Sequence, residues 1–190
     1  MVETLSPRDR LLETASRLFY AEGIHTVGVD KLVTVANVTR ATFYRHFPTK
    51  EDLVVAYLRA RDVEMRETVA ERVAAASRQK TMLAVLDFVG DYTCSPGFRG
   101  CPFINAAAEY PDPTHPVRLA VSDHRRWFRE TLAGLAADAG HPEPDYVADV
   151  LFLLHDGALQ GGELDDPQAV RATLFRAARE LLGLTDPATS

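Results

Sequence analysis

Along most of the chain, apolar residues recur every three or four positions, the spacing that places them on one face of an α-helix. The first stripe runs over Leu11–Phe19, and Ser6-Pro7 before it supplies an N-cap and a proline suited to the first helical position. Gly23 suits the end of this helix. No stretch keeps the period of two that a β-strand requires, and there is no internal repeat. The pattern predicts an all-α protein of about nine helices.

Two short helices separated by a tight turn are predicted next. The first covers the stripe Val29–Ala36, and Asn37 follows it, a residue type that tolerates the left-handed conformation of a tight turn. Thr39 then supplies an N-cap for a helix over Arg40–Phe47. Pro48 ends that helix, because proline cannot continue it.

The helix predicted over 40–47 has two unlike sides. Val38, Phe43 and Phe47 supply an apolar side, and hydrogen-bonding residues gather on the other: Arg40, Thr42, Tyr44, Arg45 and His46. Two short helices with donors on the second match a helix-turn-helix, which lays its second helix in the DNA major groove. Arg40 is the best candidate for reading a base, since arginine bonds guanine with two N–H groups. A plain solvent-exposed face is the alternative.

The segment VTRATFYRHFPTKEDL, from Val38 to Leu53, closely resembles the signature of the TetR family of bacterial transcriptional regulators. The similarity extends back through Glu22-Gly23 and Ala15–Phe19, so that it covers about residues 7–58. It implies a three-helix, helix-turn-helix DNA-binding domain over residues 1–50. Residues 51–190 would then form a larger helical domain for ligand binding and dimerisation.

The resemblance also implies which residues meet DNA. Positions that commonly hold the DNA backbone in the family correspond to Thr42, Tyr44, His46 and Lys50, and positions near the groove correspond to Val29, Thr39, Arg40, Ala41 and Arg45. The chain departs from the family pattern at three places: Val33 replaces a small alanine, Asn37 replaces a glycine, and Gly28 and Val29 occupy the place of a capping threonine or serine. We therefore expect one phosphate contact to be lost or to move to Lys31.

The rest of the chain continues as helices. A capping pattern at Thr49–Asp52 begins a long helix that is expected to reach about Ser77, and the last two helices carry apolar faces. The resemblance implies that these two pair with a second copy in a four-helix bundle. Candidates for this dimer interface are Val150, Leu154, Ala158, Gly161, Leu174, Ala177, Ala178 and Leu181. The alternative is that these faces form the chain's own core.

A small-molecule site is expected in the larger domain, where a few polar groups lie among aromatic residues. His124 precedes Trp127 and Phe128 on an apolar face, and Asn105 and Glu109 share a helix face. The full candidate set is Phe88, Tyr92, Phe103, Asn105, Glu109, His124, Trp127, Phe128 and His155. A buried histidine satisfied by a neighbouring carbonyl is the alternative for these polar groups.

Charge and composition are compatible with this picture. The formal net charge is -6, but residues 1–50 hold seven Lys or Arg against five acids, so the excess of acid lies elsewhere. The chain has neither a signal-peptide pattern nor a membrane-spanning apolar run, which predicts a cytoplasmic protein. Cys94 and Cys101 are expected to be free thiols, with a redox pair or a metal site with His115 or His124 as alternatives.

These features together predict a homodimeric repressor that binds palindromic operator DNA and is released by a small-molecule effector. A symmetric dimer suits a palindrome because two recognition helices lie ~34–36 Å apart, one turn of DNA. Effector binding would tilt the long helix that begins near Lys50. Alternatives are an activator, a co-repressor-dependent regulator, or a redox-sensing regulator acting through Cys94 and Cys101. No enzyme motif occurs, and no catalytic residue, cofactor or metal is expected.

Overall fold

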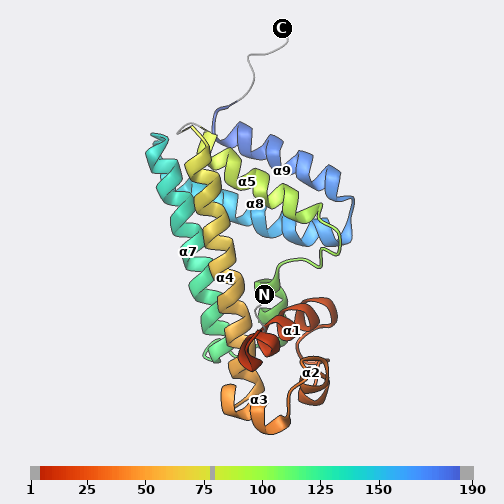
Figure 1. Cartoon of the computed structure of the whole chain (residues 1–190). Helices are drawn as coiled ribbons and strands as arrows, with labels where there is room; N and C mark the ends of the chain where they lie inside the picture. The colour runs from red at the N-terminus through yellow and green to blue at the C-terminus, as the bar shows by residue number, and fades with distance from the viewer. Residues whose placement is uncertain (1–4, 78–79, 185–190) are drawn as a thin grey trace. The chain divides into compact units, whose positions relative to one another are not determined.

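The computed structural model describes residues 5–77 and 80–184, and within these ranges the regular structure is helical (Figure 1). The nine helices of the described chain are α1 (Pro7–Glu22), α2 (Val29–Val35), α3 (Arg40–His46), α4 (Lys50–Ala75), α5 (Thr81–Thr93), α6 (Pro102–Glu109), α7 (Pro116–Asp138), α8 (Pro144–Leu164) and α9 (Pro167–Leu181). The prediction of an all-α fold is confirmed. None of the described helices is long and apolar enough to cross a membrane.

The helix ends follow from local side chains. The Ser6 hydroxyl accepts a hydrogen bond from the Asp9 amide at the start of α1, and Gly23 ends α1 with a φ of 88°. At α4, the Asp52 amide donates to the Thr49 hydroxyl (3.1 Å) and the Thr49 amide donates to the Asp52 carboxylate (2.9 Å). This reciprocal pair is the pattern predicted from the sequence, and it satisfies two N–H groups that the helix cannot.

The chain divides into two compact units. The first comprises residues up to Val63 together with Pro102–Asp123, and the second comprises Glu64–Cys101 together with residues from His124 onward. The boundary between the units therefore falls within α4, after Val63, and within α7, after Asp123. The helix-turn-helix segment shares its unit with α6, a helix far from it in the sequence.

In the first unit, α1, α2 and α3 pack against one another around a small apolar core (Figure 1). Leu11, Leu32 and Phe43 are fully buried there, and Phe47 is nearly so. Burial of these side chains supplies most of the driving force for docking three short helices, since α2 and α3 are too short to be stable alone.

In the second unit, α5, α8 and α9 pack against one another (Figure 1). Glycines on α8 permit this close approach. A Cβ added at Gly162 would lie 2.8 Å from Thr93 Cβ on α5, and one added at Gly161 would lie 3.3 Å from a Val170 methyl on α9. Gly161 and Gly162 therefore serve packing within this chain.

Candidate nucleic-acid interface

The turn between α2 and α3 is held by an arginine of α1. The Arg10 guanidinium donates to the carbonyl oxygens of Ala36 (3.1 Å) and Asn37 (3.3 Å). Asn37 adopts a φ of 53°, the left-handed conformation predicted for it. Thr39 caps α3 by accepting from the Thr42 amide at 3.1 Å. These contacts fix the direction in which α3 leaves the turn.

α3 presents an exposed polar face. Arg40, Ala41 and Arg45 are exposed, and Tyr44 keeps 46% of its surface accessible although its ring also contacts Phe43 edge-on. Thr42 and His46 are half-buried. The remaining predicted DNA-binding residues belong to the same unit: Thr39 and Lys31 are exposed, and Val29 and Lys50 are half-buried.

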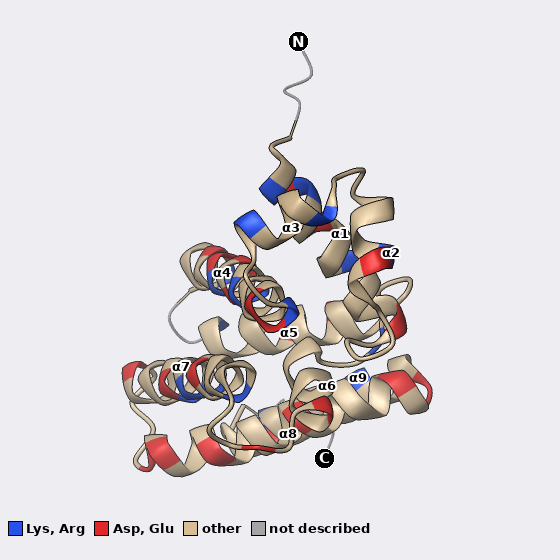
Figure 2. Ribbon diagram, turned by 90° about the horizontal axis from the view of Figure 1, so that it is seen from below, with Lys and Arg blue, Asp and Glu red and all other residues tan. Residues whose placement is uncertain are grey.

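Acidic partners accompany two of the basic residues on this face. Arg40 pairs with Asp30 of α2 at 2.8 Å, and Lys31 pairs with Glu22 of α1 at 2.5 Å. Figure 2 shows Lys, Arg, Asp and Glu positions interspersed on the ribbon of α1 to α3. A hydrogen bond with Tyr44 and the charge of Asp30 raise the pKa of Arg40 above its usual value. The Arg40 guanidinium is therefore in direct contact with α2.

Lys50 contacts the loop between α1 and α2. Its ammonium donates to the Ile24 carbonyl at 2.6 Å and lies 5.9 Å from the centre of the Phe19 ring. Burial lowers the pKa of Lys50, against the raising effect of the Glu51 and Glu109 charges. This predicted phosphate ligand thus stabilises the loop that leads into α2.

Glu109, at the end of α6, binds the same loop. Its carboxylate accepts from the amides of Ile24 (2.7 Å) and His25 (2.5 Å), so that each oxygen holds one N–H group. Next to it, Tyr110 contacts the His25 ring, and burial together with the nearby Glu51 and Glu109 charges raises its pKa to about 12. Glu109 was predicted as an effector ligand, and its two carboxylate oxygens are here engaged by the first unit's own backbone.

The other predicted effector residues divide between the units. Phe103, which is buried, and Asn105 belong to the first unit with Glu109, whereas the second unit contains Phe88, Tyr92, His124, Trp127, Phe128 and His155. Within the second unit, rings of Phe128 and His155 are 4.6 Å apart and those of His124 and Trp127 are 5.6 Å apart. Phe88 and Tyr92 stack at 6.2 Å on α5.

Charged residues that were not predicted from the sequence lie beside this cluster. Asp156 accepts from Arg125 at 2.7 Å and lies 3.2 Å from the His155 ring nitrogen, while Arg125 also covers the Phe152 ring. Burial pushes the pKa of Asp156 upward, but hydrogen bonds from His155 and Arg125 outweigh it and hold the pKa below its usual value. The spacing of Asp156 and Arg125 in the sequence gives no signal of this pairing.

A pocket of about 310 Å³ adjoins Trp127 in the second unit. Val69, Val73 and Leu135 supply apolar walls, and Arg66 and Asp138 supply charge. The Arg66 guanidinium lies 4.4 Å from the centre of the Trp127 ring. Thr131 adds a hydroxyl group to the lining, and the pocket is open to solvent.

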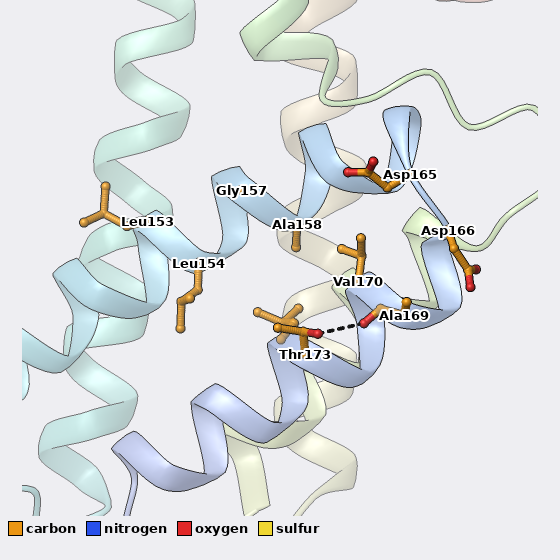
Figure 3. A pocket seen from close by; sticks show the side chains of 10 residues that line it. Leu153, Leu154, Gly157, Ala158, Asp165, Asp166, Ala169, Val170 and Thr173 are labelled. Carbon is orange, nitrogen blue, oxygen red and sulfur yellow. Dashed lines mark hydrogen bonds between the residues drawn. The ribbon is translucent and has the colours of Figure 1, made fainter.

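The predicted dimer residues on α8 and α9 differ in burial. Ala158, Leu174 and Ala178 are buried within the chain, whereas Val150, Leu154, Gly161, Ala177 and Leu181 keep partial exposure. A groove of about 490 Å³ runs between the two helices, with Leu154, Ala158, Val170 and Thr173 among its lining residues (Figure 3). Leu153 borders it with 70% of its surface accessible. Leu153 was not among the residues predicted for this interface, although it belongs to the same apolar pattern.

The described residues contain no group of three or more His, Cys, Asp or Glu that could hold a metal ion. Cys94 is half-buried and Cys101 is buried, and no disulfide joins these two described residues. The Cys94 thiol donates a weak hydrogen bond to the Pro167 carbonyl at 3.7 Å.

An all-α fold whose short second and third helices meet at a clamped turn, with an exposed polar face on the third, defines a helix-turn-helix transcriptional regulator. The chain belongs to the TetR family, as the resemblance implied. Residues 11–57 match the family of bacterial regulatory proteins of the tetR type.

Relatives extend the similarity over nearly the whole chain. The crystal structure of SCO4454, a TetR-family transcriptional regulator from Streptomyces coelicolor, has 45% sequence identity and a TM-score of 0.90, covering 93% of this chain and 94% of that one. A TetR transcriptional regulator (sav143) from Streptomyces avermitilis has 28% identity and a TM-score of 0.78, covering 92% and 98%. The HTH-type transcriptional regulator YjdC of Escherichia coli is 25% identical over 183 residues, or 92% of this chain and 93% of that protein.

Proposed function

We propose that this regulator is a homodimeric repressor that binds palindromic operator DNA through α3 and is released by a small organic effector. The observation that carries the proposal is the exposed face of α3, where Arg40, Tyr44 and Arg45 offer hydrogen-bond donors on a helix held at a fixed angle by the Arg10 contacts. Such a face supplies both base-reading and phosphate-holding groups.

The second copy is proposed to dock on α8 and α9. Apolar or small residues of α8 with exposed or partly exposed surface recur at three- and four-residue steps at Tyr146, Val150, Leu153 and Gly157, and Leu164 follows two turns later, with no charged residue in the stripe. A stripe of this kind packs against an identical stripe in a two-fold symmetric interface. A two-fold dimer then brings two α3 helices to a palindromic site.

The effector is proposed to bind in the second unit near Trp127. The pocket beside this residue and the neighbouring rings of His124 and Phe128 support this location. The dimer has one conformation in which the spacing of the two α3 helices fits DNA and another in which it does not. An effector that binds the second conformation more tightly shifts the population toward that conformation, and DNA is released. Trp127 is the single tryptophan, so its fluorescence reports binding directly.

Operator selection tests the DNA-binding part of the proposal. The full-length protein is used to enrich sequences from random duplexes, and the enriched DNA is titrated with wild type and variants. We expect Tyr44→Phe and Lys50→Ala to weaken all sites alike, and Arg40→Ala to change the preferred sequence. Arg129→Ala, an exposed arginine of α7, is the control and leaves binding unchanged. Normal affinity and preference in all three test variants would refute the role of α3.

Sedimentation tests the dimer. Leu153→Arg introduces a charge into the exposed α8 stripe and should yield a monomer, whereas Leu119→Arg, an equally apolar exposed position in the first unit, should leave the dimer intact. An unchanged sedimentation coefficient for Leu153→Arg would place the interface elsewhere.

A reporter gene behind the selected operator distinguishes a repressor from an activator. We expect the wild-type protein to lower the reporter's expression and a bound effector to restore it. Increased expression with the wild-type protein would identify an activator, and repression that requires an added compound would identify a co-repressor-dependent regulator.

A further inference from the structure

An acidic side chain lies on the surface that the proposed function assigns to DNA. Asp30 of α2 contacts Arg40 of α3, with 2.8 Å between a carboxylate oxygen and a terminal guanidinium nitrogen. The accessible fraction is 79% for the Asp30 side chain and 59% for that of Arg40. The pair therefore joins the two helices of the helix-turn-helix on their exposed side.

Neither the stability of an exposed ion pair nor phosphate binding accounts for the contact between Asp30 and Arg40. Ion pairs this exposed contribute little to folding, because water and salt screen them and the side chains lose freedom. A carboxylate on a DNA-facing surface also repels phosphates. Asp30 does lie in the first turn of α2, where negative charge is favoured, but that effect requires no arginine partner from α3.

We propose that Asp30 is a positioning residue that holds the Arg40 guanidinium for reading a base, and that it thereby determines operator specificity. This inference rests on the proposed function. A guanidinium has five N–H donors in a rigid plane, so bonding one of them to Asp30 leaves others for the two acceptors of a guanine. Holding the plane in advance reduces the side-chain freedom lost when DNA binds.

Tyr44 lies one helical turn after Arg40 and is also exposed, so both side chains belong to the polar face of α3. The contact with Asp30 places the Arg40 guanidinium over the exposed side of α2 and α3. As DNA approaches and removes water, the hydrogen bond to a charged acceptor strengthens and keeps its direction.

The second ion pair on this surface provides a matched control. Lys31 and Glu22 contact each other at 2.5 Å, and both are also substantially exposed. An ammonium group is a compact point charge without a planar fork, so its acidic partner has no orientation to impose. Removing Glu22 should alter affinity by charge alone.

The experiment uses the full-length protein and the operator that wild type selects from random duplexes. Each base pair of the operator is replaced in turn, and relative affinities are measured for wild type, Asp30→Asn, Asp30→Glu, Arg40→Ala, the Arg40→Ala/Asp30→Asn double variant and Glu22→Gln. Thermal unfolding confirms that each variant is folded.

We expect Arg40→Ala to abolish the preference at one symmetry-related pair of positions, and Asp30→Asn to reduce that same preference by roughly 3- to 10-fold, a fraction of what a full bidentate contact contributes. Asp30→Glu keeps the charge but displaces the carboxylate, so it should also reduce the preference. The double variant should retain the same preferences among base pairs as Arg40→Ala alone, because Asp30 has no guanidinium left to position. Glu22→Gln should change affinity equally for all sequences.

Three results would overturn the inference. If Asp30→Asn tightens binding to every sequence and keeps the wild-type preferences, only the charge of Asp30 matters. A preference lost at a base pair that Arg40→Ala does not affect would show that Asp30 contacts a base itself. If the wild-type protein selects no sequence at all, both the proposed function and this inference are refuted. This result is obtained in the selection step, before any variant is made, so it is distinguished from the other two.

Discussion

Replacing Glu109 by alanine should release the loop between α1 and α2 from α6. In the wild-type chain, one carboxylate oxygen accepts from the Ile24 amide at 2.7 Å and the other from the His25 amide at 2.5 Å. Neither of these two amides belongs to a helix, and α1 ends before them while α2 begins after them. Glu109 is therefore the group that satisfies both.

The size of the effect follows from the burial of the two amides. A hydrogen bond to a charged acceptor contributes ~1.5–3 kcal/mol, and a buried amide left without an acceptor loses this in full. The Ile24 amide is part-buried, whereas the His25 amide is exposed and can turn to water. We expect Glu109→Ala to lower the free energy of unfolding by about 2–4 kcal/mol. Glu109→Gln keeps one acceptor oxygen and should lose about half as much.

Hydrogen exchange measured by NMR locates the effect. Amide exchange at Ile24 and His25 should accelerate at least ~10-fold in Glu109→Ala, because each 1.4 kcal/mol corresponds to a factor of ten. Glu13→Gln, which changes an exposed carboxylate of α1, should shift the unfolding free energy by less than about 0.5 kcal/mol. Unchanged protection of both amides in Glu109→Ala would refute the role given to this carboxylate.

Further predictions concern the turn, the packing of α8 and the acid response. Asn37→Val should lose about 1–2 kcal/mol of stability, because a branched side chain is strained at a φ of 53°, whereas Asn37→Gly should lose none, as urea unfolding will report. Gly162→Ala should lose about 1–3 kcal/mol through its clash with Thr93, while Gly134→Ala, which has open space around it, should gain about 0.5–1 kcal/mol; calorimetry compares the two. The pKa of Asp156 is lowered on folding, so its ionised form stabilises the chain near neutral pH and this contribution disappears as the pH falls below about 4. Asp156→Asn should therefore flatten the acid limb of a plot of unfolding free energy against pH, and an unchanged limb would contradict this.

Features encoded by neighbouring residues were predictable from the sequence. The caps at Ser6 and Thr39 and the left-handed turn at Asn37 each depend on contacts within a few residues, so the residue type is enough to anticipate them. The exposed donors of α3 follow in the same way, because the helical period separates them from Phe43.

Features that depend on distant residues were not predictable. A helical stripe shows that a face is buried but not what covers it, so the burial of Leu174 and Ala178 within the chain required the structure. The contact between Glu109 and Ile24 joins residues 85 positions apart, and the Arg40–Asp30 pair depends on how α2 crosses α3. Sequence spacing holds no information about either.

The most direct test of sequence-specific binding through α3 is an anisotropy titration of the purified protein against its selected palindrome and a scrambled duplex, repeated at several salt concentrations. We expect one dimer per palindrome and a preference over the scrambled duplex of at least ~10³-fold that persists as salt increases. Equal binding to both duplexes that disappears as salt is added would contradict the assignment of α3 as a recognition helix.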